Sequence, residues 1–302
     1  MKANGIRRTM EDNVIDIVIY AILIVVFVMT VYPFYYSLVI SFNHGIDASR
    51  GGIYFWPRVF SLDNYKAVFS NHALLNGFGI TISRTVIGTF ATLLFTGLFA
   101  YSLSYNKLMF RTTYITLLII AMYFSGGLIP YFILLKKLQL MNTFLVYIIP
   151  LMLNAFFTII MMSFFRELPH ELKESAKMDG ASEMRIYFSI VIPISAPVFA
   201  TIALFAGVEH WNSWFDAAFF VTDKDLKTIS FMLMELINKA NLTAVQGGGG
   251  DVERAATYAA QTFTAETIRM ATMIVVIIPI ICVYPFLQRY FVKGIMVGSI
   301  KG

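Results

Sequence analysis

The chain has 302 residues, 58% of them hydrophobic and 14% charged, and its formal net charge is +5. Soluble domains carry about one quarter charged residues, so this composition excludes an ordinary soluble protein and indicates a polytopic membrane protein. The Lys and Arg residues are dispersed, which argues against a nucleic-acid partner, and a single cysteine, Cys282, excludes an internal disulfide.

Six segments are apolar over the roughly 20 residues that a helix needs to cross a bilayer core of about 30 Å. The first is too long for a signal peptide and lacks a small-residue cleavage site, so we expect it to stay as an anchor. In chain order the predicted spans are Ile15–Ile40, Ile80–Ser104, Thr113–Leu135, Phe144–Phe165, Ile186–Phe220 (kinked at Pro193 and Pro197) and Ile268–Phe291. We therefore expect an all-α membrane protein with six transmembrane helices, in which residues 1–302 form a single transmembrane domain.

Lys and Arg are denser on the segments that share a side with the N-terminus, which predicts that both termini lie in the cytoplasm. The pair Lys136–Lys137 goes against this assignment. The long cytoplasmic connection is then 166–185, and the long extracellular loops are 41–79 and 222–267. The run Gly247–Gly250 in the second loop is typical of a loop tip or a tolerated insertion, and a tip that enters a partner's binding cleft is the alternative.

The cytoplasmic connection carries the signals of a short helix. Pro169 suits its first turn, where the charge of Glu171 also suits the helix dipole. Gly180 should end the helix because glycine takes the left-handed conformation of a helix C-terminus, and Asp179 or Ser182 can cap the helix that follows. We expect a surface helix that is joined rigidly to the fifth span and can transmit force.

This short helix has a narrow apolar stripe, Leu168, Leu172 and Ser175–Ala176, opposite Lys173 and Lys177. A helix of this kind can lie on lipid headgroups or dock on another protein. Amphipathicity alone leaves both possibilities open.

A longer pattern runs from Glu174-Ser175-Ala176 through Gly180 to Ile190-Val191-Ile192-Pro193. It resembles the signature loop of ABC importer permeases, Glu-Ala-Ala, three residues, Gly, nine residues, Ile, any residue, Leu-Pro. Every spacing is kept, with Ser for one Ala and Ile for Leu. Phe124–Pro130, Asp179–Glu183, His210–Ala217 and Tyr284–Gly302 also look like carbohydrate-uptake permeases, and are most similar to the subfamily that works with lipoprotein receptors for complex oligosaccharides.

The resemblance implies a type I ABC importer permease fold in the bacterial plasma membrane. It implies a second homologous permease subunit, two cytoplasmic ATP-binding subunits and an extracellular solute-binding lipoprotein that delivers the oligosaccharide. ATP and Mg would bind to the partner ATPase subunits, since this chain has no GxxxxGK[ST] loop and is expected to be no enzyme and to bind no cofactor. The implied ATPase-docking residues are Glu171, Glu174, Ser175, Ala176, Asp179, Gly180 and Ala181, with Lys293–Gly302 near the same contact.

The second half of the fifth span carries a polar and aromatic patch. Ionisable groups at membrane depth usually face a protein interior or a wet cavity, and aromatic faces beside carboxylates and amides suit a sugar. One interpretation is a substrate path, and the other is an interfacial tryptophan belt with its polar groups satisfied between helices. The residues concerned are Glu209, His210, Trp211, Asn212, Trp214 and Asp216.

Other polar positions have structural interpretations. Arg84 is expected to reach the lipid headgroups, and Asn154 to hydrogen-bond between helices. The break at Ser125–Gly127 is a hinge or a close helix contact. His44, His72 and His170 are too scattered for a metal site.

Two other classes of function are alternatives. An ion-coupled secondary transporter would usually have more spans, inverted repeats and an ionisable relay at the midplane. A membrane enzyme would need a catalytic constellation on one membrane face, which the sequence does not show; a non-transporting membrane scaffold is the further possibility.

Overall fold

The computed structural model describes residues 10–246 and 264–299, and over these ranges it is helical, with one isolated β-bridge between Asn43 and Phe60. The chain divides into two compact units, Met1–Ser70 with Lys239–Val275 and Asn71–Asn238 with Val276–Gly302. A single domain over 1–302 stays a prediction. The run Gly247–Gly250 lies outside the described residues.

The first unit begins with α1 (Met10–Ser41), which is long and apolar enough to cross a membrane. Two short helices follow, α2 (Gly45–Ser49) and α3 (Asp63–Ser70), separated by a loop. The small apolar core of this unit consists of Val39 and Ile40 of α1, Ala48 of α2 and Ile53 of the loop.

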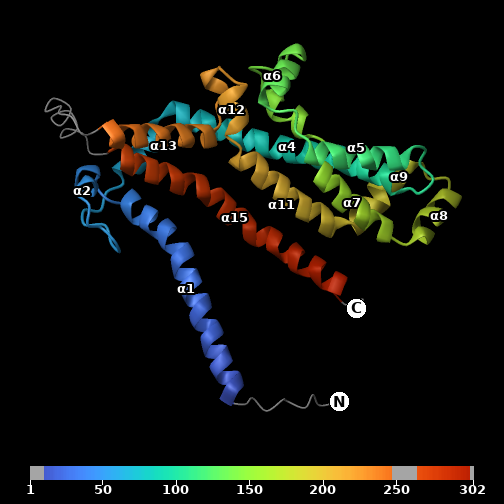
Figure 1. The fold of residues 1–302 in the computed structure, drawn as a ribbon, viewed down its shortest axis with the longest axis horizontal. Coiled ribbons are helices and arrows are strands. Elements are labelled where there is room, and N and C mark those ends of the chain that lie inside the picture. The colour runs from blue at the N-terminus through green and yellow to red at the C-terminus, as the bar shows by residue number, and fades with distance from the viewer. Residues whose placement is uncertain (1–9, 247–263, 300–302) are drawn as a thin grey trace. The chain divides into compact units, whose positions relative to one another are not determined.

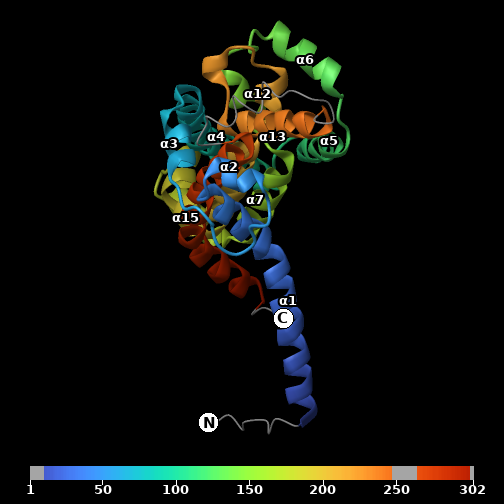
Figure 2. The same ribbon diagram turned by 90° about the vertical axis from the view of Figure 1, so that its left-hand side faces the viewer.

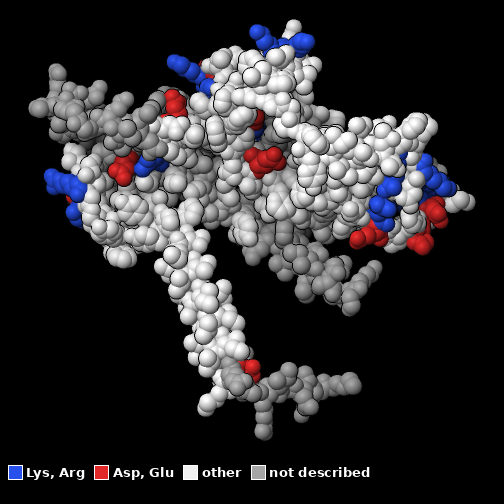
Figure 3. Space-filling view, in the orientation of Figure 1, with Lys and Arg blue, Asp and Glu red and all other residues white. Residues whose placement is uncertain are grey.

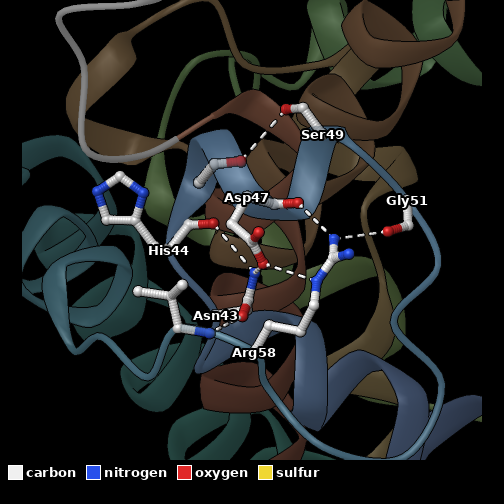
Figure 4. A network of polar contacts seen from close by, with 8 residues as sticks. Asn43, His44, Asp47, Ser49, Gly51 and Arg58 are labelled. Atoms are coloured by element: carbon white, nitrogen blue, oxygen red, sulfur yellow. Dashed lines mark hydrogen bonds and ion pairs between the residues drawn. The ribbon is translucent and has the colours of Figure 1, made fainter.

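A polar network fixes the loop between α2 and α3 (Figure 4). Asn43 Nδ2 donates to Asp47 Oδ2 at 3.0 Å, and Asn43 Oδ1 accepts from the Val59 N–H at 3.0 Å. Arg58 Nε donates to Asp47 Oδ2 at 3.1 Å, and its Nη2 donates to the Gly51 carbonyl at 2.7 Å. The hydrogen bond from Asn43, together with the charge of Arg58, lowers the pKa of Asp47. The loop is therefore held by side chains rather than by a regular element.

The second unit is organised around α4 (His72–Ser104), whose first turn is capped by Asn71. α7 (Ala155–Glu167) and α11 (Ala196–Asn212) pack along α4 (Figure 1). The shared core is apolar and includes the fully buried residues Ala100, Leu103, Met161, Phe165, Ile186, Tyr187 and Ile202.

Two glycines of α4 allow its neighbours to approach closely. A Cβ on Gly88 would overlap the ring of His210, and one on Gly97 would overlap the hydroxyl of Tyr187. No larger residue fits at either position unless these side chains move. By contrast, a Cβ on Gly79 in the same helix would meet no atom within 4 Å.

The six predicted spans correspond to three long helices and three bent pairs. The long helices contain Asp12–Ser41, His72–Ser104 and Ala265–Pro285, the last being part of α15 (Ala265–Ser299). The bent pairs are Arg111–Tyr123 with Leu128–Lys137 (119°), Phe144–Leu151 with Ala155–Glu167 (45°), and Glu183–Ile194 with Ala196–Phe219 (84°). The count reaches six when each bent pair is one span.

The third predicted span breaks between α5 (Arg111–Tyr123) and α6 (Leu128–Lys137). Gly127 has a φ of 81° and caps α6, a conformation that favours glycine. A Cβ there would meet no other atom of the chain within 4 Å, so the sharp bend at Ser125–Gly127, and not close packing inside the chain, accounts for this glycine.

The fifth predicted span is also discontinuous. It starts with α9 (Glu183–Ile186), passes through the π-helical turn η3 (Tyr187–Val191) and α10 (Ile192–Ile194), and bends before α11. The predicted kink is thus a break at Ser195.

The remaining elements are short apart from α13. They are η1 (Phe144–Tyr147), η2 (Ile149–Leu151), α8 (His170–Met178), α12 (Phe215–Phe219), η4 (Lys224–Leu226) and α13 (Ile229–Gln246). Figures 1 and 2 show α6 and α12 side by side, and the Tyr131 ring of α6 lies 5.3 Å from the ring of Phe220, the residue after α12.

Candidate functional site

α8 ends in a tight corner at Gly180, which has a φ of 76°. The N–H of Ala181 donates to the Ala176 carbonyl at 2.9 Å, and the N–H of Gly180 donates to the Lys177 carbonyl at 3.0 Å. These two bonds form a Schellman motif, which places a left-handed residue just after the helix and explains the glycine. Ser182 Oγ then accepts a backbone N–H of α9. The predicted helix stop at Gly180 and cap at Ser182 are confirmed.

The lysine face of α8 turns toward its own chain. Lys177 Nζ pairs with Glu183 Oε1 at 2.6 Å, and the hydroxyls of Tyr105 and Tyr101 donate to Glu183 Oε2 at 2.7 and 3.0 Å. Lys173 is buried, with Nζ 5.3 and 5.4 Å from the ring centres of Tyr105 and Tyr101. We call these five side chains the Glu183 cluster.

The Glu183 cluster joins α8 to the start of α9 and to the C-terminal end of α4. The hydrogen bond with Glu183 raises the pKa of Lys177, whereas burial lowers the pKa of Lys173. No member of the cluster was a predicted site residue. The helical spacing of the two lysines and of Tyr101 with Tyr105 was visible, but it does not show which face turns inward.

The opposite face of α8 is open. Leu172 is 43% exposed and Met178 is 88% exposed, so apolar side chains lie among acidic ones on this face. Figure 3 shows charged side chains gathered at the α8 end of this unit, next to an uncharged surface over α4 and α5. Of the predicted docking residues, Glu171, Glu174, Ser175, Asp179 and Gly180 are exposed, while Ala176 and Ala181 pack partly on the chain's own core.

A buried ion pair lies at the C-terminal end of α11. Arg84 is 0% exposed; its Nη2 pairs with Asp216 Oδ2, and its Nη1 donates to the Ser213 carbonyl at 3.1 Å. The guanidinium also lies 4.6 Å from the centre of the Tyr147 ring. The prediction that Arg84 reaches the lipid headgroups is wrong, because a carboxylate, a carbonyl and an aromatic face inside the protein hold its charge.

The six predicted path residues fall into two sets. His210 and Trp211 are buried, and the Trp211 indole N–H donates to a carbonyl of α15 at 3.2 Å. Together with Asp216, which is paired, they lie in contacts between helices. The exposed residues that can reach a solute are Glu209, Asn212 and Trp214.

A cleft of about 540 Å³ opens beside the bend in the third span. It is lined by Ser125–Gly127 and by the side chains of Tyr131 and Phe215, which neighbours Trp214 in the chain. Backbone without helical hydrogen bonds is tolerated in a membrane-crossing segment where it is buried in protein or lines a wet cavity. Polar backbone beside aromatic faces suits a hydroxyl-rich solute.

The structure also bears on the predictions for Asn154, for a metal site and for the C-terminal segment. Asn154 caps α7, with its Oδ1 accepting from the Phe157 N–H at 3.1 Å, and its backbone N–H donates to Thr96 Oγ1 of α4 at 3.3 Å, so it bonds between helices through its main chain and not through its side chain. Over 10–246 and 264–299, no three His, Cys, Asp or Glu side chains are grouped as a metal site. The side chains of Lys293–Gly302 lie outside the described part.

The sequence has clear relatives. Residues 86–297 match the model of a family described as binding-protein-dependent transport system inner membrane component. The chain is 37% identical to Protein LplC of Bacillus subtilis, over 91% of this chain and 90% of that protein. It is 34% identical to the polygalacturonan/rhamnogalacturonan transport system permease protein YtcP of the same species, over 97% and 100%. It is 28% identical to the arabinooligosaccharides transport system permease protein AraQ of Halalkalibacterium halodurans, over 91% and 92%.

A solved structure is similar over nearly the whole length. It is a chain from the crystal structure of a bacterial ABC transporter involved in the import of the acidic polysaccharide alginate, with a TM-score of 0.86 and 26% identity. The match covers 95% of this chain and 100% of that chain. The two chains therefore share one helical fold.

Proposed function

Because this chain belongs to the family of binding-protein-dependent transport system inner membrane components and has the fold of a type I ABC importer permease, we propose that it moves oligosaccharides into the cell. The names of two relatives give polygalacturonan/rhamnogalacturonan and arabinooligosaccharides as cargo, which supports this substrate class. The observation that carries the mechanism is the rigid corner at Gly180, with an open face of α8 on one side and the fifth span on the other. Family membership argues against the secondary transporter and scaffold alternatives.

The open face of α8 is the proposed dock for an ATP-binding subunit. Glu171 and Glu174 offer carboxylates to basic or hydroxyl groups of that partner, and exposed Leu172 and Met178 offer apolar contacts. The inner face is already bonded through the Glu183 cluster, so a push on α8 is passed to both α4 and α9. ATPase closure would thereby turn the spans between outward and inward access.

The proposed substrate path runs along the exposed half of the polar patch and the cleft at the third-span bend. Glu209 and Asn212 are three residues apart at the end of α11, so they share one helix face. Trp214 and Phe215 supply aromatic faces, and their ring centres are 6.1 Å apart. The other three predicted path residues pack beneath this surface and hold it in place: His210, Trp211 and Asp216.

The full transporter proposed has a second homologous permease subunit, two cytoplasmic ATP-binding subunits that hold ATP and Mg, and an extracellular solute-binding lipoprotein. Both termini would be cytoplasmic, and residues 166–185 would face the ATPases. Loops 41–79 and 222–267 would then face the receptor. This chain would itself bind only lipid, protein partners and the sugar in transit.

Photo-crosslinking tests the docking proposal. A photoreactive amino acid in place of Met178, in the complex purified from cells, is expected to crosslink to an ATP-binding subunit because this position is open beside the acidic residues. The same group in place of Phe60, exposed on the proposed extracellular loop, is the matched control and should give no such product. Crosslinks from Met178 to lipid alone would contradict the dock.

A further inference from the structure

The loop between α2 and α3 presents three consecutive aromatic side chains. Tyr54, Phe55 and Trp56 are 60%, 65% and 77% exposed. Adjacent large apolar side chains on a surface mark a place that meets a partner or a membrane. The proposed transport path and the dock on α8 use none of them.

The aromatic side chains are held outward by a fixed backbone. Gly51 and Gly52 have φ values of 69° and 71°, which turn the chain in a conformation that other residues rarely adopt. The next residue, Ile53, is buried in the small core of the unit. Arg58 closes the loop from the far side through its bond to the Gly51 carbonyl. Exposure of the three rings is therefore built into the loop and does not result from local unfolding.

Helix α1 gives the level of this loop relative to a bilayer. The Tyr35 hydroxyl donates to the Phe55 carbonyl at 2.6 Å, and the rings of Tyr32 and Phe55 are 6.4 Å apart. After Asp16 the sequence has no Asp, Glu, Lys or Arg until Asp47. At a rise of 1.5 Å per residue, Tyr35 lies about 28 Å from Asp16, close to the thickness of the hydrocarbon core, about 30 Å. Tyr35 and the loop bonded to it thus lie at the interface opposite Asp16.

We propose that Tyr54, Phe55 and Trp56 insert into the headgroup region of the bilayer and anchor the far end of α1 there. Tyrosine and tryptophan favour this region because their rings combine an apolar body with a polar group. The loop has no charge between Arg50 and Arg58, and in this arrangement the two flanking cations would meet the lipid phosphates. The carboxylate bonded to the loop, Asp47, is already paired with Arg58.

A lipid surface fits this patch better than a protein. The bonded neighbour of the loop, α1, is itself the most lipid-like helix of the unit, with no part of its apolar window buried within the chain. The aromatic patch continues this apolar surface, through Tyr32, up to the polar network around Asn43. The proposal does not depend on the transported sugar or on the ATPase.

Fluorescence quenching by lipid tests the anchor. The full chain is reconstituted in vesicles of phosphatidylglycerol and brominated phosphatidylcholine. In one preparation the bromine lies near the headgroup, and in the other it lies near the end of the acyl chain. Subtracting the emission of Trp56→Phe from that of the wild type isolates Trp56, since Trp211 and Trp214 are present in both. We expect the shallow bromine to remove most of the Trp56 emission and the deep bromine to remove much less.

Water-soluble acrylamide gives the opposing result. Strong quenching of Trp56 by acrylamide, with none by either brominated lipid, would overturn the proposal and leave the patch free for a protein partner. An Arg58→Ala variant provides a second measurement, because it opens the loop without touching the rings. The shallow preference should be lost in that variant; the same depth profile in both chains would contradict the fixed-loop argument.

Discussion

Asp216→Asn is the change that separates packing from transport in the polar patch. The substitution keeps the size of the side chain but removes the negative charge that faces Arg84, which is 0% exposed. The guanidinium would keep the Ser213 carbonyl, the Tyr147 ring and the neutral amide oxygen of the new asparagine, and Glu209 would be the remaining negative charge near it. Breaking a buried ion pair by removing one of its charges costs about 3–5 kcal/mol. Because the Asp216 side chain is 17% exposed and admits some water, we expect a loss near the lower end, about 3 kcal/mol.

The assay is unfolding of the purified chain in detergent micelles, titrated with sodium dodecyl sulfate and followed by tryptophan fluorescence. A loss of about 3 kcal/mol lowers the ratio of folded to unfolded protein more than a hundredfold. The double variant Arg84→Met with Asp216→Leu removes both charges, and we expect it to lie within about 1 kcal/mol of the wild type. Glu209→Gln, at an exposed acid of the same patch whose charge lies near Arg84, removes no hydrogen bond to Arg84 and should lower stability by much less than Asp216→Asn.

Wild-type stability of Asp216→Asn together with loss of sugar uptake would refute the structural role of this carboxylate, because it would then act on the solute and not on Arg84. Loss of uptake in Glu209→Gln with stability kept would support the exposed half of the patch as the path.

The remaining predictions concern helix contacts and the α8 corner. Gly88→Ala and Gly97→Ala should each destabilise the chain by about 1–3 kcal/mol, because the new methyl group overlaps His210 or Tyr187. Gly79→Ala in the same helix is the control and should not lower stability. Equal melting temperatures for all three variants would contradict the close packing. Gly180→Ala should destabilise the corner by about 1–2 kcal/mol because its φ of 76° is left-handed, and hydrogen exchange at the Ala181 amide should rise. Glu183→Gln should increase the mobility of a spin label at position 178, with little effect on the melting temperature because the ion pair with Lys177 is half exposed. Glu167→Gln, at an exposed acid at the end of α7, is the control. Equal label mobility in both variants would show that the Glu183 cluster does not couple α8 to α4 and α9.

Local signals were enough to predict part of the architecture. A continuous apolar run predicted α1, and glycine chemistry predicted the stop at Gly180, because each depends on residues that are neighbours in the chain. The same kind of signal located the interruptions near Ser125–Gly127 and Pro193. It did not give their bend angles, which depend on packing against other helices.

Contacts between distant residues could not be predicted in this way. Arg84 and Asp216 are 132 positions apart, and a lone arginine in an apolar run looks the same whether it reaches headgroups or a buried carboxylate. Tyr101 and Glu183 in the Glu183 cluster are 82 positions apart. The alternation of charge along α8 was visible, but the inward turn of its lysines depends on these distant partners.

Uptake by the reconstituted complex tests the central claim most directly. Labelled oligosaccharide, its receptor and ATP are supplied to proteoliposomes that contain the wild-type chain or Gly180→Val with all partner subunits. We predict ATP-dependent uptake with the wild type, and loss of both uptake and sugar-stimulated ATP hydrolysis with Gly180→Val although the complex still assembles, because valine cannot form the left-handed corner. Uptake driven by an ion gradient without ATP, or full stimulation in the Gly180→Val complex, would contradict the account.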